Sequence, residues 1–340
     1  MPLVNSHTNW DKLEEVWLGD VYPASWYDYL DSEIRDIFYQ ITEITKQDLQ
    51  TIENKLKSFG VTVRRPRYDQ QDRFMSGDHL IKPRIMPRDD FSVIGNELRI
   101  NWNELGWESV LNEYRQDNNS VIIHDNFLPS SSGQVRVGRD IYFDFCYKNR
   151  QVDVVQQTLE QAYEQSLKDY RIHLLFNGGH IDSCFSVLKP GLIFASRYFE
   201  DYERTFPGWH LLNSHGPEFE NVRRRQGDWG GQSWQFDPAV GSQKFSEHVF
   251  QYARDWIGDY IETIFEVNCL MLDEKNVMVL SAPDDSLEEF ERHGITPHPM
   301  PFRARTFWDG GLHCLTLDIR RQSSAQDYFP DRGATKITIY

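Results

Sequence analysis

The sequence of 340 residues contains 52 acidic and 36 basic side chains, which gives a formal net charge of −16 at neutral pH. A surface of this charge repels nucleic-acid phosphates and anionic membranes, so neither is expected as a partner. The 10 Trp, 16 Tyr and 21 Phe supply the apolar surface that disordered chains lack, and we expect a globular, soluble protein.

The sequence predicts a cytoplasmic protein with reduced thiols. Its four cysteines are too sparse for a secreted disulfide scaffold, and none forms a C-x-x-C pair. The N-terminal residues lack the basic and apolar regions of a signal peptide, and no apolar run is long enough to span a membrane.

Short apolar runs and helical spacing of apolar residues alternate along the chain. In chain order they predict strand 14–18, helix 33–58, strands 61–64, 91–94, 121–124 and 141–144, helix 152–168, strands 171–176, 184–188 and 192–195, helix 246–260, strands 264–272 and 277–280, and helix 286–293. Gly60 is expected to cap the end of the first helix. Asp285, with Glu288 three residues later, is expected to cap the start of the last.

Several segments share a hairpin of two apolar arms that is often followed by a helix. They include residues 91–100, 184–194 and 269–279, and the last has its hairpin loop at residues 273–276. This weak repeat recurs about five times, which predicts pseudo-symmetric packing within a single domain over residues 1–340. Residues 207–240, rich in Gly and Trp without periodicity, are predicted to form a lid or binding loop.

Three clusters of polar residues could carry chemistry. In the first, Asn177-Gly-Gly-His-Ile-Asp182, two glycines follow an apolar strand and permit a tight turn. We therefore expect His180 and Asp182 at a strand end, where catalytic groups concentrate, with both side chains on one face if they continue the strand. The other two clusters are Met86-Pro-Arg-Asp-Asp90 and Asp309-Gly-Gly-Leu-His-Cys-Leu-Thr-Leu-Asp318.

Cys314 is the cysteine with the best case for reactivity. A single Cys is most often a small buried apolar side chain, but Cys314 follows Gly310-Gly311 and His313 near the start of a predicted strand. A reactive thiolate needs a nearby cation or dipole, which His180 could supply.

The sequence supports a metal site less well than a reactive cysteine. Possible ligands are His180, Asp182, His313 and Cys314, but no H-E-x-x-H or C-x-x-C motif supports such a site. Neither a Walker A motif nor G-x-G-x-x-G or G-x-S-x-G occurs. We expect no metal and no cofactor.

Taken together, these motifs resemble the amidinotransferase family, which includes glycine amidinotransferase, the inosamine-phosphate enzymes and the enzymes of cylindrospermopsin and saxitoxin synthesis. The resemblance rests on His180-Ile-Asp182 before an apolar strand and on Gly310-Gly-Leu-His-Cys-Leu-Thr-Leu-Asp-Ile-Arg-Arg321. Further matching stretches are Arg88-Asp89 with Val93-Ile-Gly95, Gly138-Arg-Asp-Ile141 and Leu270-Met-Leu-Asp-Glu-Lys-Asn-Val-Met-Val279. It extends from about Asn5 to Arg321 and leaves the remaining residues as a tail.

The resemblance implies an α/β fold, a five-bladed pseudo-symmetric propeller of ββαβ modules with the site in its central channel. It implies transfer of the amidino group of L-arginine, or a related guanidino donor, through a covalent amidino-cysteine to a small primary amine, with release of ornithine. The catalytic residues implied are Cys314 as nucleophile, His180 as acid and base, and Asp182. The substrate-binding residues implied are Asp89, Asn177 and Arg197. A homodimer is implied as well.

This chain departs from the family pattern at two places. The family has an aspartate paired with the histidine. The aligned stretch here is Leu128-Pro-Ser-Ser-Ser-Gly133, which places a serine, at or near Ser130, where the aspartate would be. Asp125 is the nearest carboxylate in sequence. Where the family has serines that hold the donor's carboxylate, this chain has Glu262, which would repel that group, whereas Arg197 could still clamp it.

Two other functions stay open on the same residues. In a hydrolase of the same superfamily, such as an arginine deiminase-like protein, water would resolve the cysteine adduct, and the fold could not separate the two reactions. Because the aspartate is missing, the second alternative is a catalytically silent binding protein.

Overall fold

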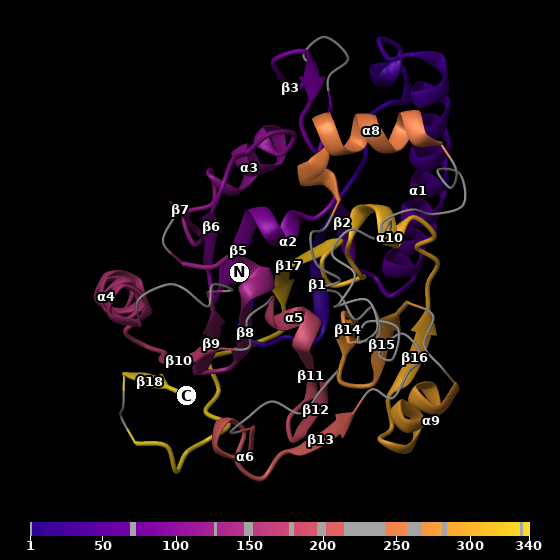
Figure 1. Cartoon of the computed structure of the whole chain (residues 1–340). Helices are drawn as coiled ribbons and strands as arrows, with labels where there is room; N and C mark the ends of the chain where they lie inside the picture. The colour runs from indigo at the N-terminus through magenta and orange to yellow at the C-terminus, as the bar shows by residue number, and fades with distance from the viewer. Residues whose placement is uncertain are drawn as a thin grey trace.

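The structure is a computed structural model that describes residues 2–68, 73–125, 128–145, 152–176, 180–195, 202–213, 242–257, 267–280, 284–333 and 336–340. Within these ranges the strands lie towards the middle of the molecule and the longer helices lie around them (Figure 1). The peripheral helices are α1 (Ser32–Ser58), α3 (Glu108–Tyr114), α4 (Val152–Ala162) and α9 (Asp284–Arg292). The predicted α/β class is therefore confirmed.

Four sheets in the described ranges share one plan, in which two antiparallel strands are followed by a helix and a third strand parallel to the second. Their strands are β5 (Phe91–Ile94), β6 (Glu97–Ile100) and β7 (Val121–His124); β8 (Gln134–Val137), β9 (Asp140–Asp144) and β10 (Arg171–Leu175); β11 (Phe185–Lys189), β12 (Leu192–Ala195) and β13 (His210–Asn213); and β14 (Leu270–Asp273), β15 (Asn276–Val279) and β16 (Thr296–Pro299). The connecting helices are α3, α4, α6 (Tyr202–Thr205) and α9.

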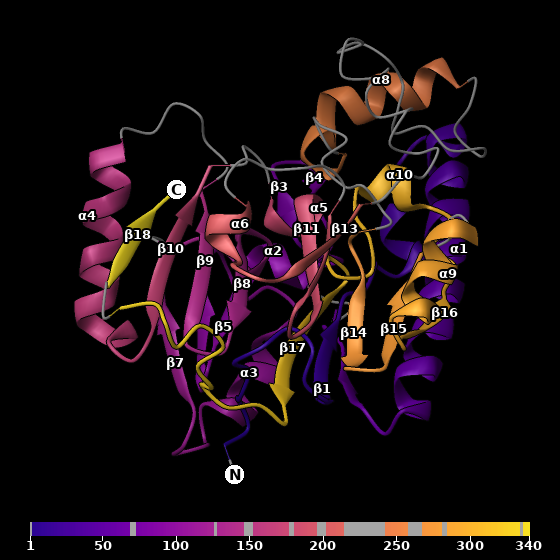
Figure 2. The ribbon, with the colours of Figure 1, turned by 90° about the horizontal axis from the view of Figure 1, so that it is seen from below.

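A fifth sheet follows the same plan but is built from both ends of the described chain. Strand β17 (Thr316–Arg321) pairs antiparallel with β1 (Leu13–Leu18), and β2 (Thr62–Arg64) adds parallel to β1 after α1. Figure 2 shows β17 and β1 side by side near the centre of the molecule. The plan that the repeat predicted is therefore present in five sheets of the described residues.

The remaining elements of the described chain are short, apart from the ten-residue α8. They are η1 (Ala24–Tyr27), β3 (Met75–Ser76), β4 (His79–Leu80), α2 (Pro87–Asp90), η2 (Ser131–Gly133), η3 (Tyr163–Leu167), α5 (Ile181–Cys184), α8 (Gln243–Tyr252), η5 (Arg254–Trp256), α10 (Arg305–Trp308) and β18 (Ile337–Ile339). The π-helical η3 extends α4, so the predicted helix 152–168 is confirmed.

Helix α1 shows why the sequence forms these elements. The Asp31 side chain caps its start by accepting from the Glu33 N–H at 3.1 Å. Apolar residues recur at helical spacing along one buried face. They are Ile34, Ile37, Phe38, Ile41, Leu49, Ile52 and Leu56. After the helix, Gly60 adopts a φ of 77° and donates to the Lys57 carbonyl at 2.9 Å, which confirms its predicted capping role.

Several predicted boundaries were wrong. The helix expected at 246–260 is α8, which begins earlier because the Ser242 side chain accepts from the Phe245 N–H at 3.1 Å, and it ends at Tyr252. Residues 258–260 lie outside the described ranges. Helix α9 begins at Asp284, so Asp285 lies inside its first turn and does not cap it.

Two segments that were predicted to lack regular structure contain a strand. Of residues 207–240, the lid prediction falls mostly on 214–240, which lie outside the described ranges, whereas His210–Asn213 forms β13. Among the residues expected as a tail, β18 pairs parallel with β10, Ile337 lying opposite Ile172 (Figure 2).

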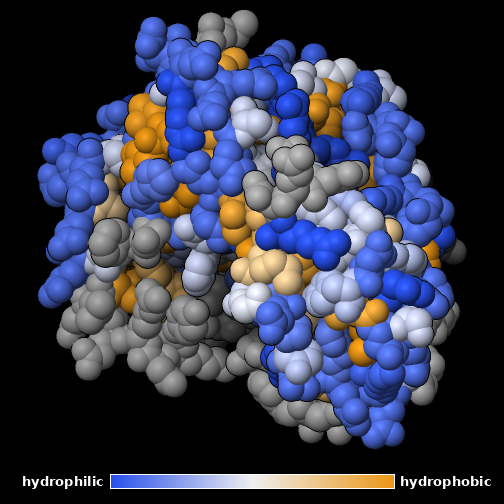
Figure 3. All heavy atoms as spheres, turned by 90° about the horizontal axis from the view of Figure 1, so that it is seen from above, coloured by the Kyte–Doolittle hydropathy of each residue, from blue (hydrophilic) through white to orange (hydrophobic). Residues whose placement is uncertain are grey.

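One face of the surface can be described by its hydropathy. The face seen in Figure 3 is mostly hydrophilic, with smaller hydrophobic groups between the polar ones. In the described ranges, no helix combines the length and the apolar character that crossing a membrane requires.

Candidate active site

The candidate site is assembled from equivalent positions of the five sheets. In each sheet, a polar side chain that belongs to the site lies two or three residues ahead of the first strand of the antiparallel pair. These side chains are Asp89 before β5, Ser132 before β8, Asp182 before β11, Asn268 before β14 and Cys314 before β17. Three of the turns are the short helices α2, η2 and α5.

The turn that carries Cys314 is shaped by two glycines. It follows Asp309, whose φ of 52° lies in the left-handed region that most residues avoid. A Cβ on Gly310 would lie 2.4 Å from the Met86 side chain, and one on Gly311 would lie 2.6 Å from the Asn268 Oδ1. At Gly311 a Cβ would also lie 2.7 Å from the Asn268 Cβ, so glycine is what lets this turn approach Asn268 closely.

Asn268 connects the Cys314 turn to the rest of the site. Its Oδ1 accepts from the backbone N–H groups of His313 at 2.9 Å and Cys314 at 3.0 Å. Its Nδ2 donates to the Cys314 Sγ at 3.0 Å and to the Asp182 carbonyl at 3.2 Å. One side-chain amide therefore fixes both the backbone and the sulfur of Cys314.

Cys314 lies directly beside Asp182. The Cys314 Sγ is 3.5 Å from the Asp182 Oδ2, which also accepts from the His313 Nδ1 at 2.9 Å. Cys314 is 4% exposed and Asp182 is 1% exposed, so the contact is shielded from solvent. The other Asp182 oxygen, Oδ1, is buried without a hydrogen-bond partner in the described residues, which leaves it able to accept from a ligand.

Burial and neighbouring charges set the protonation of this group. Burial raises the pKa of Asp182, but the hydrogen bond from His313 and the charges of His313, His180 and Arg88 outweigh it, so the pKa lies below its ordinary value. Burial and the Arg88 charge lower the pKa of His313 to about 4. The lowered pKa keeps Asp182 a carboxylate, which accepts a hydrogen bond from the His313 Nδ1.

The thiol of Cys314 is protonated in this arrangement. Burial raises its pKa well above the ordinary value, and the carboxylates of Asp182 and Asp89 raise it further. The hydrogen bonds from Gly311 and Asn268 offset only part of this effect. A cation placed between the two carboxylates would remove much of the repulsion and favour the thiolate.

A cavity of about 720 Å³ opens beside these residues. Asp89, Ser132 and His180 line it, together with the carboxylates Asp90, Asp144 and Asp255. Burial raises the pKa of Asp89, against the His180 charge and a hydrogen bond from Ser132. The Asp89 Oδ1 is buried without a partner in the described residues, so it too can accept from a ligand.

The structure brings four of the six predicted site residues together. Cys314 and Asp182 are in contact, and Asp89 and His180 line the adjacent cavity. Asn177 and Arg197 lie outside the described residues, as does Glu262.

One expectation about the histidine cluster was wrong. His180 and Asp182 do not continue a strand, because residues 181–184 form the one-turn helix α5, with His180 at its N-terminus. The Ser183 hydroxyl donates to the His180 carbonyl at 2.7 Å and stabilises this turn.

The serine segment has a role that the sequence did not show. Ser130 and Ser132 are hydrogen-bonded at 3.0 Å, and Ser132 bonds to Asp89, so this segment supports the Asp89 carboxylate. Asp125 forms an ion pair with Arg99 and accepts from the Leu128 N–H at 3.2 Å, and it does not line the cavity.

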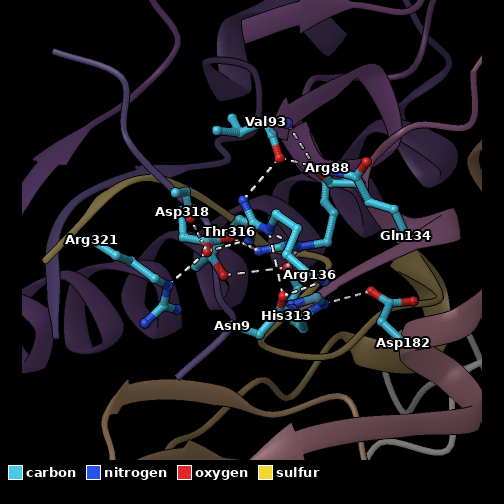
Figure 4. A network of polar contacts seen from close by, with 12 residues as sticks. Asn9, Arg88, Val93, Gln134, Arg136, Asp182, His313, Thr316, Asp318 and Arg321 are labelled. Atoms are coloured by element: carbon cyan, nitrogen blue, oxygen red, sulfur yellow. Dashed lines mark hydrogen bonds and ion pairs between the residues drawn. The ribbon is translucent and has the colours of Figure 1, made fainter. Parts of the chain in front are cut away.

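Behind the Cys314 turn lies a buried cluster of three arginines around one aspartate (Figure 4). Asp318 pairs with Arg88 at 2.8 Å, Arg136 at 2.5 Å and Arg321 at 2.7 Å. Burial raises the pKa of Asp318, but the three guanidinium groups bring it well below its ordinary value. Figure 4 shows the contacts continuing from this cluster to His313 and Asp182.

Arg88 joins this cluster to the site. Its Nε donates to the carbonyls of His313 at 2.7 Å and Thr316 at 2.8 Å, on either side of Cys314. The next residue along the chain is Asp89, so one segment positions both the Cys314 turn and a carboxylate of the cavity. The Arg88-Asp89 motif marked this segment in the sequence, but only the fold shows what Arg88 contacts.

No group of three or more His, Cys, Asp or Glu side chains in the described ranges is arranged to hold a metal ion. The polar groups of the site suit a cationic organic ligand, since buried carboxylate oxygens without partners flank a thiol.

Curated relatives of the chain are amidinotransferases. The chain is 23% identical to the mitochondrial glycine amidinotransferase of Xenopus tropicalis, over 96% of this chain and 85% of that protein. It is 21% identical to the L-arginine:L-lysine amidinotransferase of Pseudomonas savastanoi pv. phaseolicola, over 96% of both chains. No protein-family model matches the chain. The predicted resemblance to the amidinotransferase family is confirmed.

Solved structures show the same fold. An amidinotransferase of saxitoxin biosynthesis from Microseira wollei superposes with a TM-score of 0.67 at 21% identity, covering 96% of this chain and 100% of that one. The inosamine-phosphate amidinotransferase of Streptomyces griseus superposes with a TM-score of 0.68 at 18% identity, covering 96% and 99%. A dimethylarginine dimethylaminohydrolase also matches, with a TM-score of 0.53 at 11% identity over 90% of this chain and 99% of that one.

Proposed function

Starting from the relationship to amidinotransferases, we propose that this protein transfers the amidino group of L-arginine through Cys314 to a small primary amine and releases ornithine. The observation that carries the proposal is the contact of the Cys314 Sγ with the Asp182 carboxylate at 3.5 Å, beside a cavity lined by Asp89 and His180. The relatives include an enzyme whose name gives arginine and lysine as substrates, which supports arginine as the donor.

The two carboxylates fit the demands of a guanidino donor. A guanidinium is a poor electrophile, so its carbon must be held facing the sulfur, and paired carboxylates hold a planar guanidinium best. Asp182 and Asp89 each have one buried oxygen without a partner in the described residues. Binding of the donor between them would also offset the charges that raise the pKa of Cys314, so that the substrate helps to form the thiolate.

Group transfer then takes two steps. His180 takes the thiol proton of Cys314, and the thiolate attacks the guanidino carbon. The bond from that carbon to the ornithine nitrogen then breaks as His180 gives this proton to the leaving amine. The acceptor amine next loses a proton to His180 and attacks the same carbon, and the carbon–sulfur bond breaks to return the thiolate. His180 lines the cavity and therefore has access to both amines.

We also propose the finer features of the family for this chain. The five sheets would be the blades of a pseudo-symmetric propeller whose central turns carry the site. The single catalytic domain, the homodimer and the cytoplasmic location stay predictions. Arg197 and Asn177 stay the proposed partners of the donor's polar end.

Incubation with labelled arginine tests the function. We expect labelled ornithine only when an amine such as glycine or lysine is present, because the amidino group then has an acceptor. Citrulline or ammonia formed without an amine would instead indicate a hydrolase, the reaction named for one structural neighbour. If arginine gives no products and no mass increase on the protein, the chain is a binding protein.

The Asp89→Asn variant tests the electrostatic part of the mechanism. Asp89 is one of two carboxylates that raise the pKa of Cys314, so its removal should lower that pKa in the ligand-free protein. The pH profile of alkylation by iodoacetamide should therefore move to lower pH. At the same time kcat/KM for arginine should fall by at least about tenfold, because a charge-assisted hydrogen bond to the donor is lost.

Asp90→Asn is the matched control for Asp89→Asn. Asp90 lies next in the chain and lines the same cavity, but it is paired with Arg84 and is not among the groups that raise the pKa of Cys314. Its alkylation profile should match that of the unaltered protein. A profile that is unshifted, or shifted to higher pH, in Asp89→Asn would contradict the mechanism.

A further inference from the structure

The cavity beside Cys314 contains a cation that the mechanism above does not use. Among the described residues that line the cavity, the Lys and Arg side chains are Lys82 and Arg84. Arg84 is neutralised by Asp90, at 3.2 Å. The Lys82 ammonium forms no ion pair or hydrogen bond with any residue in the described part of the chain.

Three exposed lysines of the described chain provide a comparison. Lys57, Lys168 and Lys244 are exposed, and each forms an ion pair with a nearby carboxylate. Lys82 is only partly exposed and lies in a concave site, where an unpaired charge loses part of its hydration. An unpaired, partly buried ammonium is a ready partner for an anionic group of a ligand.

The backbone of Lys82 is held in place by hydrogen bonds and by the proline that follows it. The Tyr22 hydroxyl donates to the Lys82 carbonyl at 3.3 Å, and the preceding Ile81 N–H donates to the Phe74 carbonyl at 3.0 Å. Pro83 follows and restricts the backbone of Lys82. The ammonium lies within electrostatic range of the reacting region, since its charge lowers the pKa of both Asp89 and Asp90 against the larger effect of burial.

The cavity is lined by groups of opposite charge. Its carboxylate Asp89, together with Asp182 at the sulfur, suits a guanidinium, whereas its ammonium Lys82 suits an anion. A cavity of about 720 Å³ has room for more than a guanidinium group. Its charges therefore match a ligand that carries a cationic nitrogen group at one end and a carboxylate at the other.

We infer that Lys82 binds the carboxylate of a substrate, so that the donor or the acceptor is recognised as an amino acid rather than as a plain amine. This inference rests on the proposed function for the identity of the two substrates. The carboxylate can come from arginine itself or from an amino-acid acceptor, and the two sources are separable by experiment.

The test compares ligands that differ only in the carboxylate. Arginine is paired with agmatine as donor, and glycine with methylamine as acceptor. If Lys82 binds the donor, Lys82→Met should weaken arginine binding to the Cys314→Ser protein by about tenfold in calorimetry, with agmatine unchanged. If it binds the acceptor, the KM for glycine should rise about tenfold, with methylamine unchanged.

Two further variants show whether charge is the cause. Lys82→Arg should restore most of the lost affinity, because it keeps the positive charge at this place. Lys57→Met, which removes an exposed lysine far from the cavity lining, should change neither ligand pair.

The inference is overturned if Lys82→Met affects the carboxylated and decarboxylated ligands equally, or affects none of them. It is also overturned if the unaltered protein binds no carboxylated ligand more tightly than its decarboxylated counterpart. Ornithine formation by the unaltered protein is measured separately, so the proposed transfer reaction can hold even where the inference about Lys82 is overturned. Arginine binding without any turnover would count against the transfer reaction and still test Lys82.

Discussion

The Cys314→Ala variant is expected to release no ornithine from arginine, a loss of at least about a thousandfold in turnover. The variant keeps Asp89, Asp182 and His180, so arginine should still bind in the cavity. It lacks the sulfur that lies 3.5 Å from the Asp182 carboxylate, so no covalent intermediate can form. Intact-mass measurement after exposure to arginine should show an added amidino group on the unaltered protein and none on the variant.

Cys269→Ala is the matched control for Cys314→Ala. Cys269 is also a free, buried cysteine, but it packs in an apolar cluster, and burial raises its pKa to about 12. The adduct and the turnover should both survive this change, because an inert thiol takes no part in the reaction. An adduct that persists in Cys314→Ala would show that another residue is the nucleophile.

The second large effect concerns stability. Asp318→Asn should lower the free energy of unfolding by about 3–5 kcal/mol, because it leaves three buried guanidinium groups without their shared carboxylate. The depressed pKa of Asp318 means that its stabilisation is present at neutral pH. This stabilisation is lost only as the pH falls below the ordinary carboxyl pKa towards the lower value in the folded protein. Chemical denaturation at neutral pH measures the difference.

Glu289→Gln provides the comparison at the surface. Glu289 pairs with Arg292 on the exposed side of α9, where solvent screens the charges, and its removal should leave the denaturation midpoint unchanged. A similarly small change in Asp318→Asn would contradict the role given to the cluster. If Asp318→Asn does not fold, Ser6→Ala tests the same group, since the Ser6 hydroxyl donates to the Asp318 Oδ2 at 3.1 Å, and a loss of about 1 kcal/mol is expected.

The candidate residues could be predicted where their motifs are local in sequence. Two glycines precede His180 and Asp182, and two glycines precede Cys314, so the turns and their polar residues stand out from the apolar strands around them. The turn types could not be predicted, because a helix of four residues such as α5 is too short to show periodicity.

Asn268 could not be identified from its own surroundings in the sequence. Its side chain bonds to Asp182 and to the Cys314 turn, and both lie far from it along the chain. The repeat contained the missing signal, since Asn268 stands two residues before β14 as Asp89 stands two residues before β5. The predicted boundaries hid this signal, because the predicted strand 264–272 contains Asn268 and no strand was predicted directly after Ser132.

The Arg88 cluster shows a different limit. Its members come from α2, β8 and β17, and the sequence gives no reason to expect three arginines around Asp318. Buried charges are usually avoided, so hydrophobic patterning assigns such residues to the surface. Their partnership becomes visible only when the sheets are packed together.

The pairing of β17 with β1 bears on the order in which the protein is assembled during synthesis. In the other four sheets the three strands of the shared plan follow one another in the chain, and β18 adds to one of them later, but β1 must wait for β17, which is synthesised much later than β1 itself. Joining segments so far apart carries the largest loop-closure cost in the molecule, and such contacts form slowly. The carboxylates Asp89 and Asp182 are therefore expected to reach their sheets before β17 brings Cys314 beside them.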